Sequence, residues 1–355
     1  IMSKDKTRRE FIKETCANAL LGGVFLSQIP LPLDPLPDDI KTDSKPNNIT
    51  SPQSLVVDVK SRTEIIKGMT PNISLVKQMV NSGITSLTGT DNPKAAWKSL
   101  FHEDERIGIK INGLGADMLT GNYQICWAIV DALKGIGVKE NNIIIWDQYQ
   151  HFFLSSGFKI NRSFKGVRTY TMDGGGGKEA LDSGSSHREY DSGYGAVKIS
   201  RILTEEVDSL INLGLLKDHG LAGVSIALKN ISHGVISHPD NFHDNACDPF
   251  IAAINSIPVI KDKIKLHICN GIVGLYDGGP MPQRKHIWNN NGIILSRDPV
   301  ALDTIGMNII EEKRKEKDLR SLFNRPNLPV HIETAAKYGL GVSDINLINH
   351  KTVLI

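Results

Sequence analysis

The sequence predicts an α/β fold, a mainly parallel sheet covered by helices on both faces, with a Gly/Ser-rich inserted loop. From about Leu55 onward, short aliphatic runs alternate with amphipathic helical segments, as in a parallel sheet with crossover helices. Residues 143–146 are continuously apolar, which is typical of a strand buried on both faces. With 40% hydrophobic and 23% charged residues, the 355-residue chain has an ordinary globular composition, which excludes wholesale disorder and a multi-span membrane protein.

Residues 1–29 resemble a twin-arginine export signal. The paired Arg8 and Arg9 are followed by Phe11, Ile12 and Lys13, and a moderately apolar stretch then runs to about residue 29. The resemblance implies the twin-arginine export machinery as a partner and a location in the periplasm or cell envelope. The segment is short for a transmembrane helix and lacks a clear cleavage site, so cleavage and retention as a membrane tether both stay open.

The remaining chain divides into a linker and a domain. Residues 30–54 are expected to form a Pro-rich linker, because six of the 16 prolines lie between positions 30 and 52. Residues 55–355 are expected to form a single α/β domain.

The apolar periodicity places the elements of this domain in order along the chain. Helices are expected at 73–82, 93–101, 122–135, 247–256, 299–312 and 330–338. Strands are expected at 107–111, 143–146, 167–172, 208–213, 223–228, 264–269 and 292–296. Residues 173–198 are rich in Gly and Ser, and we expect them to form the inserted loop, either a mobile loop or a lid.

Charge and cysteine usage exclude two classes of function. The net charge is only +2, and residues 1–29, with five basic and three acidic side chains, hold the whole excess, so the domain has no basic field for nucleic acid. None of the four cysteines has the close spacing of a zinc or ferredoxin motif, so no iron–sulfur cluster is expected. Cys126 and Cys269 lie in apolar segments and are expected to be buried hydrophobic residues.

Polar residues follow several of the expected strands, at the carboxyl ends where open parallel sheets bind ligands. One such residue alone is usually a helix cap or a turn residue, so the inference depends on its repetition at five strand ends. The residues expected to act in catalysis are Lys110, Asp147, Lys217, His219 and Lys229. Those expected to bind the ligand are Asn112, Asn212, Asn230, Asp277, Gly278 and Gly279.

A histidine-rich segment at residues 233–248 predicts a divalent metal, because it holds three of the 11 histidines among several carboxylates. We expect His219 and His243 to be the ligands. The alternative is a solvated loop in which Asp244 or Asn245 caps the following helix.

The glycines at 113 and 115 do not make a dinucleotide site. The third glycine of that fingerprint falls on Met118, and the acidic residue that should follow, Asp147, comes too late.

Several long motifs follow one another in the region from about residue 105 to residue 345. They are Ile109-Lys110-Ile111-Asn112-Gly113, the strand at 143–147, Leu216-Lys217-Asp218-His219, Ala227-Leu228-Lys229-Asn230, His243, Asp277-Gly278-Gly279-Pro280, Asp298-Pro299-Val300-Ala301-Leu302-Asp303 and Gly339-Leu340-Gly341. In this order they resemble the family catalogued as domain of unknown function 362. Some relatives carry ferredoxin-type cysteine clusters that this chain lacks, so the resemblance implies no electron-transfer role and no particular reaction.

Together these observations predict an exported enzyme that uses lysine and histidine, or a divalent metal, on a small anionic molecule. Lysines near a buried sheet can lose their charge and act as bases or imine-forming nucleophiles. Alternatively, Lys217 and Lys229 hold an anion as fixed charges. The protein would then be a non-catalytic envelope protein that binds a ligand or cofactor.

Overall fold

The computed structural model describes residues 54–67 and 70–355. The expected export signal, residues 1–29, and residues 30–53 of the expected linker lie outside the described residues. All described residues belong to one compact unit, Thr50–Ile355.

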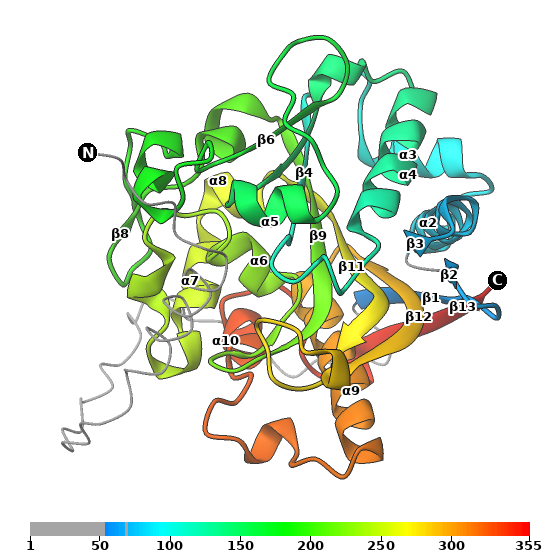
Figure 1. Ribbon diagram of the computed structural model, residues 1–355, viewed down its shortest axis with the longest axis vertical. Helices are drawn as coiled ribbons and strands as arrows, with labels where there is room; N and C mark the ends of the chain where they lie inside the picture. Colours follow the sequence, from blue (N-terminus) through cyan, green and yellow to red (C-terminus); the bar gives the residue numbers. More distant parts are fainter. Residues whose placement is uncertain (1–53, 68–69) are drawn as a thin grey trace, which may run out of the picture. The chain divides into compact units, whose positions relative to one another are not determined.

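A nine-stranded sheet forms the centre of the described part of the chain (Figure 1). From one edge to the other its strands are β13 (Ile348–Leu354), β1 (Ser54–Lys60), β12 (Ile287–Ser296), β11 (Ile264–Leu275), β9 (Ser209–His219), β4 (Ile107–Ile111), β5 (Ile143–Asp147) and β6 (Arg168–Thr171). The ninth strand, β10 (Gly223–Ser225), pairs with β9 beside this row. Most neighbours are parallel, including β9, β4, β5 and β6 in succession, so the predicted mainly parallel α/β sheet is confirmed.

Helices cover both faces of the sheet. Successive side chains of each strand point to opposite faces, so apolar side chains on both faces need helices to bury them. Ile143 and Ile145 pack in the core beneath one group of helices, whereas Ile144 and Trp146 belong to a core on the other side. The first group is α2 (Ile73–Thr88), α3 (Pro93–Leu100) and α4 (Asn122–Gly135). Helices on the other face are α6 (Leu228–Ser232), α7 (Phe250–Ser256), α8 (Pro258–Lys261), α9 (Pro299–Glu316) and α10 (His331–Lys337), as Figure 1 shows.

Shorter elements join these layers. They are β2 (Ile66–Lys67), β3 (Thr70–Pro71), α5 (Gln150–Ser155), the hairpin of β7 (Tyr190–Asp191) with β8 (Ala196–Val197), and short 3₁₀ or π turns such as Lys178–Gly184 and Ile202–Glu206. The predicted inserted loop, residues 173–198, therefore has local structure. At its start, Asp173 accepts hydrogen bonds from the backbone N–H groups of Gln150, Gly175 and Gly177.

Two helices begin at residues whose side chains cap the first backbone N–H groups of the helix. Asn72 accepts hydrogen bonds from Ser74 and Leu75 at the start of α2. Asp298 caps α9 by accepting from the N–H of Ala301, and its other oxygen accepts from Val342. Asp298 is thus a structural residue that also ties the C-terminal segment to α9.

The expected strand at 223–228 is wrong in its second half. β10 ends at Ser225, and α6 begins at Leu228, so Lys229 and Asn230 lie on a helix instead of following a strand. The buried carboxylate of Asp303 accepts hydrogen bonds from the N–H groups of Ala227 and Leu228 and so starts the helix. A short apolar run cannot distinguish helix from strand by its pattern alone.

Three other differences concern strands and one helix start. β9 runs on to His219, so Asn212 lies in the middle of a strand. The expected helix at 247–256 begins at Phe250, after a turn at Asn245–Cys247. β1 and β13 were not predicted as strands, although they form one side of the sheet.

Cys126, Cys247 and Cys269 are free and buried, which confirms the expected burial of Cys126 and Cys269.

Within residues 54–67 and 70–355, none of the helices combines the length and the apolar character needed to cross a membrane.

The position of β5 between two helical layers predicts the effect of truncating its core. Ile145→Ala is expected to lower the free energy of unfolding by about 2–5 kcal/mol, because Ile145 is fully buried and the change leaves a cavity. Ile160→Ala is the matched control, since Ile160 is 36% exposed, and we expect a loss of less than about 0.5 kcal/mol. Urea unfolding followed by circular dichroism measures both, and equal losses would contradict this burial.

Candidate functional site

The five residues predicted to act in catalysis come together at the carboxyl edge of the sheet. Lys110 lies near the end of β4, Asp147 ends β5, and Lys217 and His219 lie at the end of β9. Lys229 reaches the same place from α6. Each is at least nine-tenths buried, so the site is an interior one.

A buried ion pair joins β4 to β5. The Lys110 Nζ donates to Asp147 Oδ1 at 2.9 Å, to the Ile111 carbonyl oxygen at 2.7 Å and to Asn230 Oδ1 at 3.0 Å. Asp147 also accepts from the N–H groups of Gly113 and Gln148. Burial lowers the pKa of Lys110, while Asp147 opposes that change. The three donated hydrogen bonds use all three N–H groups of an ammonium ion.

Gly113 permits the close approach of this carboxylate. A Cβ at position 113 would lie 2.7 Å from Asp147 Oδ2 and 2.9 Å from the backbone of Phe152. The glycine after Asn112 therefore serves the Asp147 contact and is not part of a nucleotide fingerprint.

Two of the residues predicted to bind ligand instead support Lys110. Asn230 donates to Asn212 Oδ1 at 2.7 Å, and Asn212 in turn donates to the Ala227 carbonyl oxygen and hydrogen-bonds His267 Nδ1 at 3.0 Å. Their polar atoms are used within the protein, so these asparagines fix the position of the lysine. Their contact with a ligand stays a prediction.

Lys217 has a different environment from Lys110. Its Nζ donates to the Leu114 carbonyl oxygen at 2.8 Å and to Asn112 Oδ1 at 3.3 Å, both uncharged acceptors. Burial is the main cause that lowers the pKa of Lys217 to about 7; Asp147 opposes the change, and the charges of Lys229 and Lys110 add to it. Among the described residues, no carboxylate lies within ion-pair distance of this amine.

Lys229 contacts a histidine and a cysteine. Its Nζ lies 3.3 Å from His243 Nε2 and 3.4 Å from Cys247 Sγ. Burial lowers the pKa of Lys229, and burial and the charge of Lys229 lower the pKa of His243 to about 4. His243 is therefore a neutral imidazole at neutral pH.

His219 is held in one tautomer. Its Nδ1 accepts hydrogen bonds from the backbone N–H groups of Leu221 and Ala222, at 3.1 and 3.2 Å. Burial, with the charges of Lys229 and Lys217, lowers the pKa of His219 well below its usual value. A neutral imidazole that accepts at Nδ1 carries its proton on Nε2, so His219 is suited to donate to a ligand and poorly suited to bind a metal.

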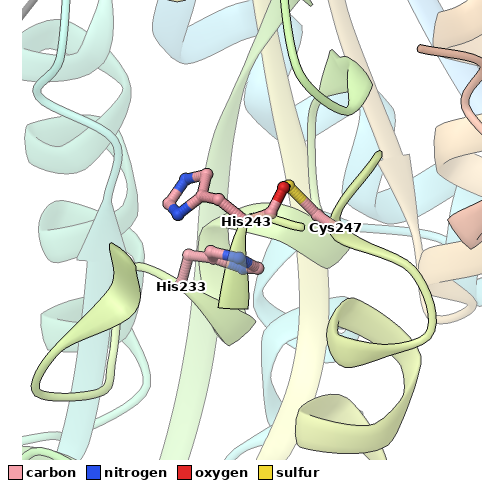
Figure 2. Close-up of side chains that lie close together, drawn as sticks. All are labelled: His233, His243 and Cys247. Carbon is pink, nitrogen blue, oxygen red and sulfur yellow. The ribbon is translucent and has the colours of Figure 1, made fainter. Parts of the chain in front are cut away.

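The structure groups His243 with His233 and Cys247, while the His219 ring stacks beside His243 with the ring centroids 6.4 Å apart. One ligand atom from each of His233, His243 and Cys247 lies within 4.8 Å of the other two, and Figure 2 shows the three side chains together. His233 and Cys247 were in the histidine-rich segment but were not assigned a role. Their sequence spacing resembles no metal motif, so only the fold brings them together.

Asp277, Gly278 and Gly279 lie beside the end of β9. The Gly279 N–H donates to Asp218 Oδ2 at 2.9 Å, and Asp277 pairs with Arg314 at 2.7 Å. The same loop packs against the glycine loop after β4, because a Cβ on Gly115 would lie 2.5 Å from Pro282. This loop therefore borders the site, while its Asp277 carboxylate is already paired.

Comparison with known proteins identifies a family for this chain. The sequence profile of the family described as "Domain of unknown function (DUF362)" matches residues 107–308, more than half of the chain. No curated protein matches. Among solved structures, the chain is similar to a Thermotoga maritima protein determined by a structural genomics consortium, with 10% identity and a TM-score of 0.36. The match covers 72% of this chain and 61% of that protein.

The Lys110 ion pair predicts a large difference between two aspartate substitutions. Asp147→Ala is expected to cost about 3–5 kcal/mol of unfolding free energy, because it leaves a buried ammonium without its counter-charge. Asp131→Ala removes the partner of Lys77 in a pair whose side chains are about half exposed, and should cost at most about 1 kcal/mol. Denaturant unfolding compares them, and a loss under about 1 kcal/mol for Asp147→Ala would contradict the pairing.

Proposed function

The chain belongs to the family described as Domain of unknown function (DUF362), and because that description names no reaction, we propose the function from the site itself. We propose that the protein is an enzyme that binds a small anionic molecule at the carboxyl edge of β4, β5 and β9. The Lys217 amine acts there as a base or as an imine-forming nucleophile. The observation that carries the proposal is a buried amine with only uncharged hydrogen-bond acceptors.

The hydrogen bonds of the two lysines support different protonation states. Lys110 donates three hydrogen bonds, one of them to a carboxylate, as an ammonium ion can. Among the described residues Lys217 donates two, which matches the two N–H groups of a neutral amine and leaves its lone pair for a proton or a carbonyl carbon. A lysine amine without its proton is the form that acts as base or nucleophile.

The charge of the site supports an anionic ligand. The charges of Lys110 and Lys229 lower the pKa of Lys217, whereas the charge of Asp147 raises the pKa of both Lys217 and Lys110. Among the described residues no carboxylate lies within ion-pair distance of Lys229, so a bound anion would supply negative charge beside this amine. His219 would add a neutral hydrogen-bond donor through its Nε2–H.

The lysine chemistry needs no metal, so a divalent metal at the neighbouring histidines is a separate proposal with its own test. The alternative function is an accessory protein that binds its ligand without catalysis, and it is favoured by the three hydrogen bonds that fix Lys110. It differs in needing a charge at Lys217 instead of a free lone pair.

Export is the second part of the proposal. The support is the Arg8-Arg9 pair and the apolar stretch after it, which lie outside the described residues. The partner would be the twin-arginine export machinery, and the protein would act in the periplasm or cell envelope.

Lys217 is expected to react as a neutral amine near pH 7. Reductive methylation with formaldehyde and cyanoborohydride should label Lys217 with a rate that rises with pH and is half-maximal at about pH 7, since the amine loses its proton above its pKa. Lysines in water keep their protons to about pH 10, so exposed lysines should be labelled far less at pH 7. Peptide mass spectrometry locates the label.

Two comparisons separate the enzyme from the accessory protein. Lys217→Arg keeps the positive charge but has no nucleophilic amine, so an enzyme would lose trapping of small keto acids by borohydride while an anion clamp would keep ligand binding. Inorganic phosphate or a keto acid should protect Lys217 from methylation. Methylation of Lys217 only above pH 9, without protection, would contradict the proposal.

Replacing both arginines of the signal is expected to stop export. The double change Arg8→Lys with Arg9→Lys keeps the charge but removes the planar guanidinium groups, so the tagged full chain should stay in the cytoplasm. The control, Lys4→Arg with Lys6→Arg, should export normally. Fractionation and immunoblotting decide, and normal export of the double-lysine variant would rule out a twin-arginine signal.

A further inference from the structure

His233, His243 and Cys247 form a cluster that the lysine chemistry does not use. All three lie on the segment that follows the start of α6, and their ligand atoms lie within 4.8 Å of one another (Figure 2). His233 and Cys247 are buried, and His243 is half-buried. We call these three residues the His/His/Cys cluster.

His243 presents a lone pair to this cluster. Its Nδ1 lies 2.9 Å from the Pro239 carbonyl oxygen, and a carbonyl can only accept, so Nδ1 carries the proton. Nε2 is then the free nitrogen, and it points to Lys229. A second ring nitrogen bonded to a backbone carbonyl is the usual arrangement behind a metal-binding histidine.

His233 is fixed in the same manner with its nitrogens exchanged. Its Nε2 donates to the Phe242 carbonyl oxygen at 2.8 Å, which leaves the lone pair on Nδ1. The Ser232 hydroxyl lies 3.1 Å from Nδ1 and 3.3 Å from the Lys229 carbonyl oxygen. The hydroxyl can turn to that carbonyl, so it keeps a hydrogen bond when Nδ1 binds something else.

Cys247 is held by an unusual turn. Asn245, Ala246 and Cys247 have φ angles of 49°, 57° and 62°, which is the left-handed region that side chains other than glycine seldom adopt. This turn places Sγ 3.4 Å from the Lys229 amine. The same amine lies 3.3 Å from His243 Nε2, so it already contacts two of the three ligand atoms.

We propose that His233 Nδ1, His243 Nε2 and Cys247 Sγ bind one zinc-class metal ion, and that the Lys229 amine competes with the metal for this position. The proposal goes beyond the proposed function, because it needs neither Lys217 nor an anionic ligand. On binding, the S–H bond of Cys247 breaks, its proton passes to solvent, and a sulfur–metal bond forms. The Lys229 amine leaves the space between the two ligands.

The donor set selects the class of metal. One thiolate and two imidazoles suit zinc or cobalt and disfavour magnesium and calcium, which prefer oxygen ligands. Three protein ligands also leave a fourth position of a tetrahedral ion open, as in catalytic zinc sites. A metal here would therefore keep one coordination position for a further ligand.

Cobalt substitution tests the cluster without any assay of activity. Purified full chain, stripped with a chelator, is titrated with Co²⁺ and then with Zn²⁺. We expect one Co²⁺ per chain, a thiolate-to-cobalt charge-transfer band in the near ultraviolet, and loss of the band on displacement by Zn²⁺. Absence of the band in both the unsubstituted chain and Lys229→Met would overturn the proposal.

Ligand variants and matched controls locate the site. Cys247→Ser, His243→Gln and His233→Gln should each weaken Zn²⁺ binding at least about 100-fold. Cys269→Ser and His350→Gln, outside the cluster, should bind as the unsubstituted chain does. A charge-transfer band that survives in Cys247→Ser and disappears in Cys269→Ser would place the thiolate elsewhere and overturn the assignment.

Lys229→Met gives the sharpest result, because it should improve binding. The change keeps the three ligands and the length of the side chain but removes the competing amine, so Zn²⁺ affinity should rise at least about tenfold. Unchanged or weaker Zn²⁺ binding would overturn the proposal that the Lys229 amine competes with the metal. Since Lys217 remains in every variant, the methylation test of Lys217 fails or succeeds independently of these outcomes.

Discussion

The ion pair between Lys110 and Asp147 is the interaction on which the rest of the site depends. It joins the carboxyl ends of β4 and β5, and through Asn230 and Asn212 it is connected to α6 and β9. A buried ammonium is costly unless a counter-charge and further hydrogen bonds satisfy it, and here all three of its N–H groups are used. The same hydrogen bonds that satisfy Lys110 therefore fix the elements that carry Lys217 and Lys229.

The use of Asp147 by Lys110 leaves the other two amines without a carboxylate of their own. Lys217 then donates to neutral oxygens, and Lys229 contacts a thiol and an imidazole. Burial, together with the charge of Lys229, lowers the pKa of both His219 and His243. The site thus combines amines of lowered pKa with imidazoles of fixed tautomer. The proposed lysine chemistry uses the amine of Lys217, and the proposed metal site uses the lone pairs of His233 and His243.

Some elements were predictable because their pattern is local. The strand at 107–111 and the helix at 122–135 coincide with β4 and α4, since their apolar spacing and the flanking glycines are read from the sequence. Lys229 and Asn230 were placed after a strand because an apolar run does not distinguish the two structures. Only the carboxylate of Asp303, 76 residues away from Ala227, makes that run turn into α6.

The sequence by itself determined the α/β class and placed Lys110, Asp147 and Lys217 at the carboxyl edge of the sheet, because strand ends in a parallel sheet share one edge. Tertiary structure alone decided which charges pair, which tautomer His219 keeps, and that His243 lies among His233, Cys247 and His219. Those outcomes depend on backbone groups such as the N–H of Leu221 and the carbonyl of Pro239. Every residue has such groups, so no sequence pattern records where they will point.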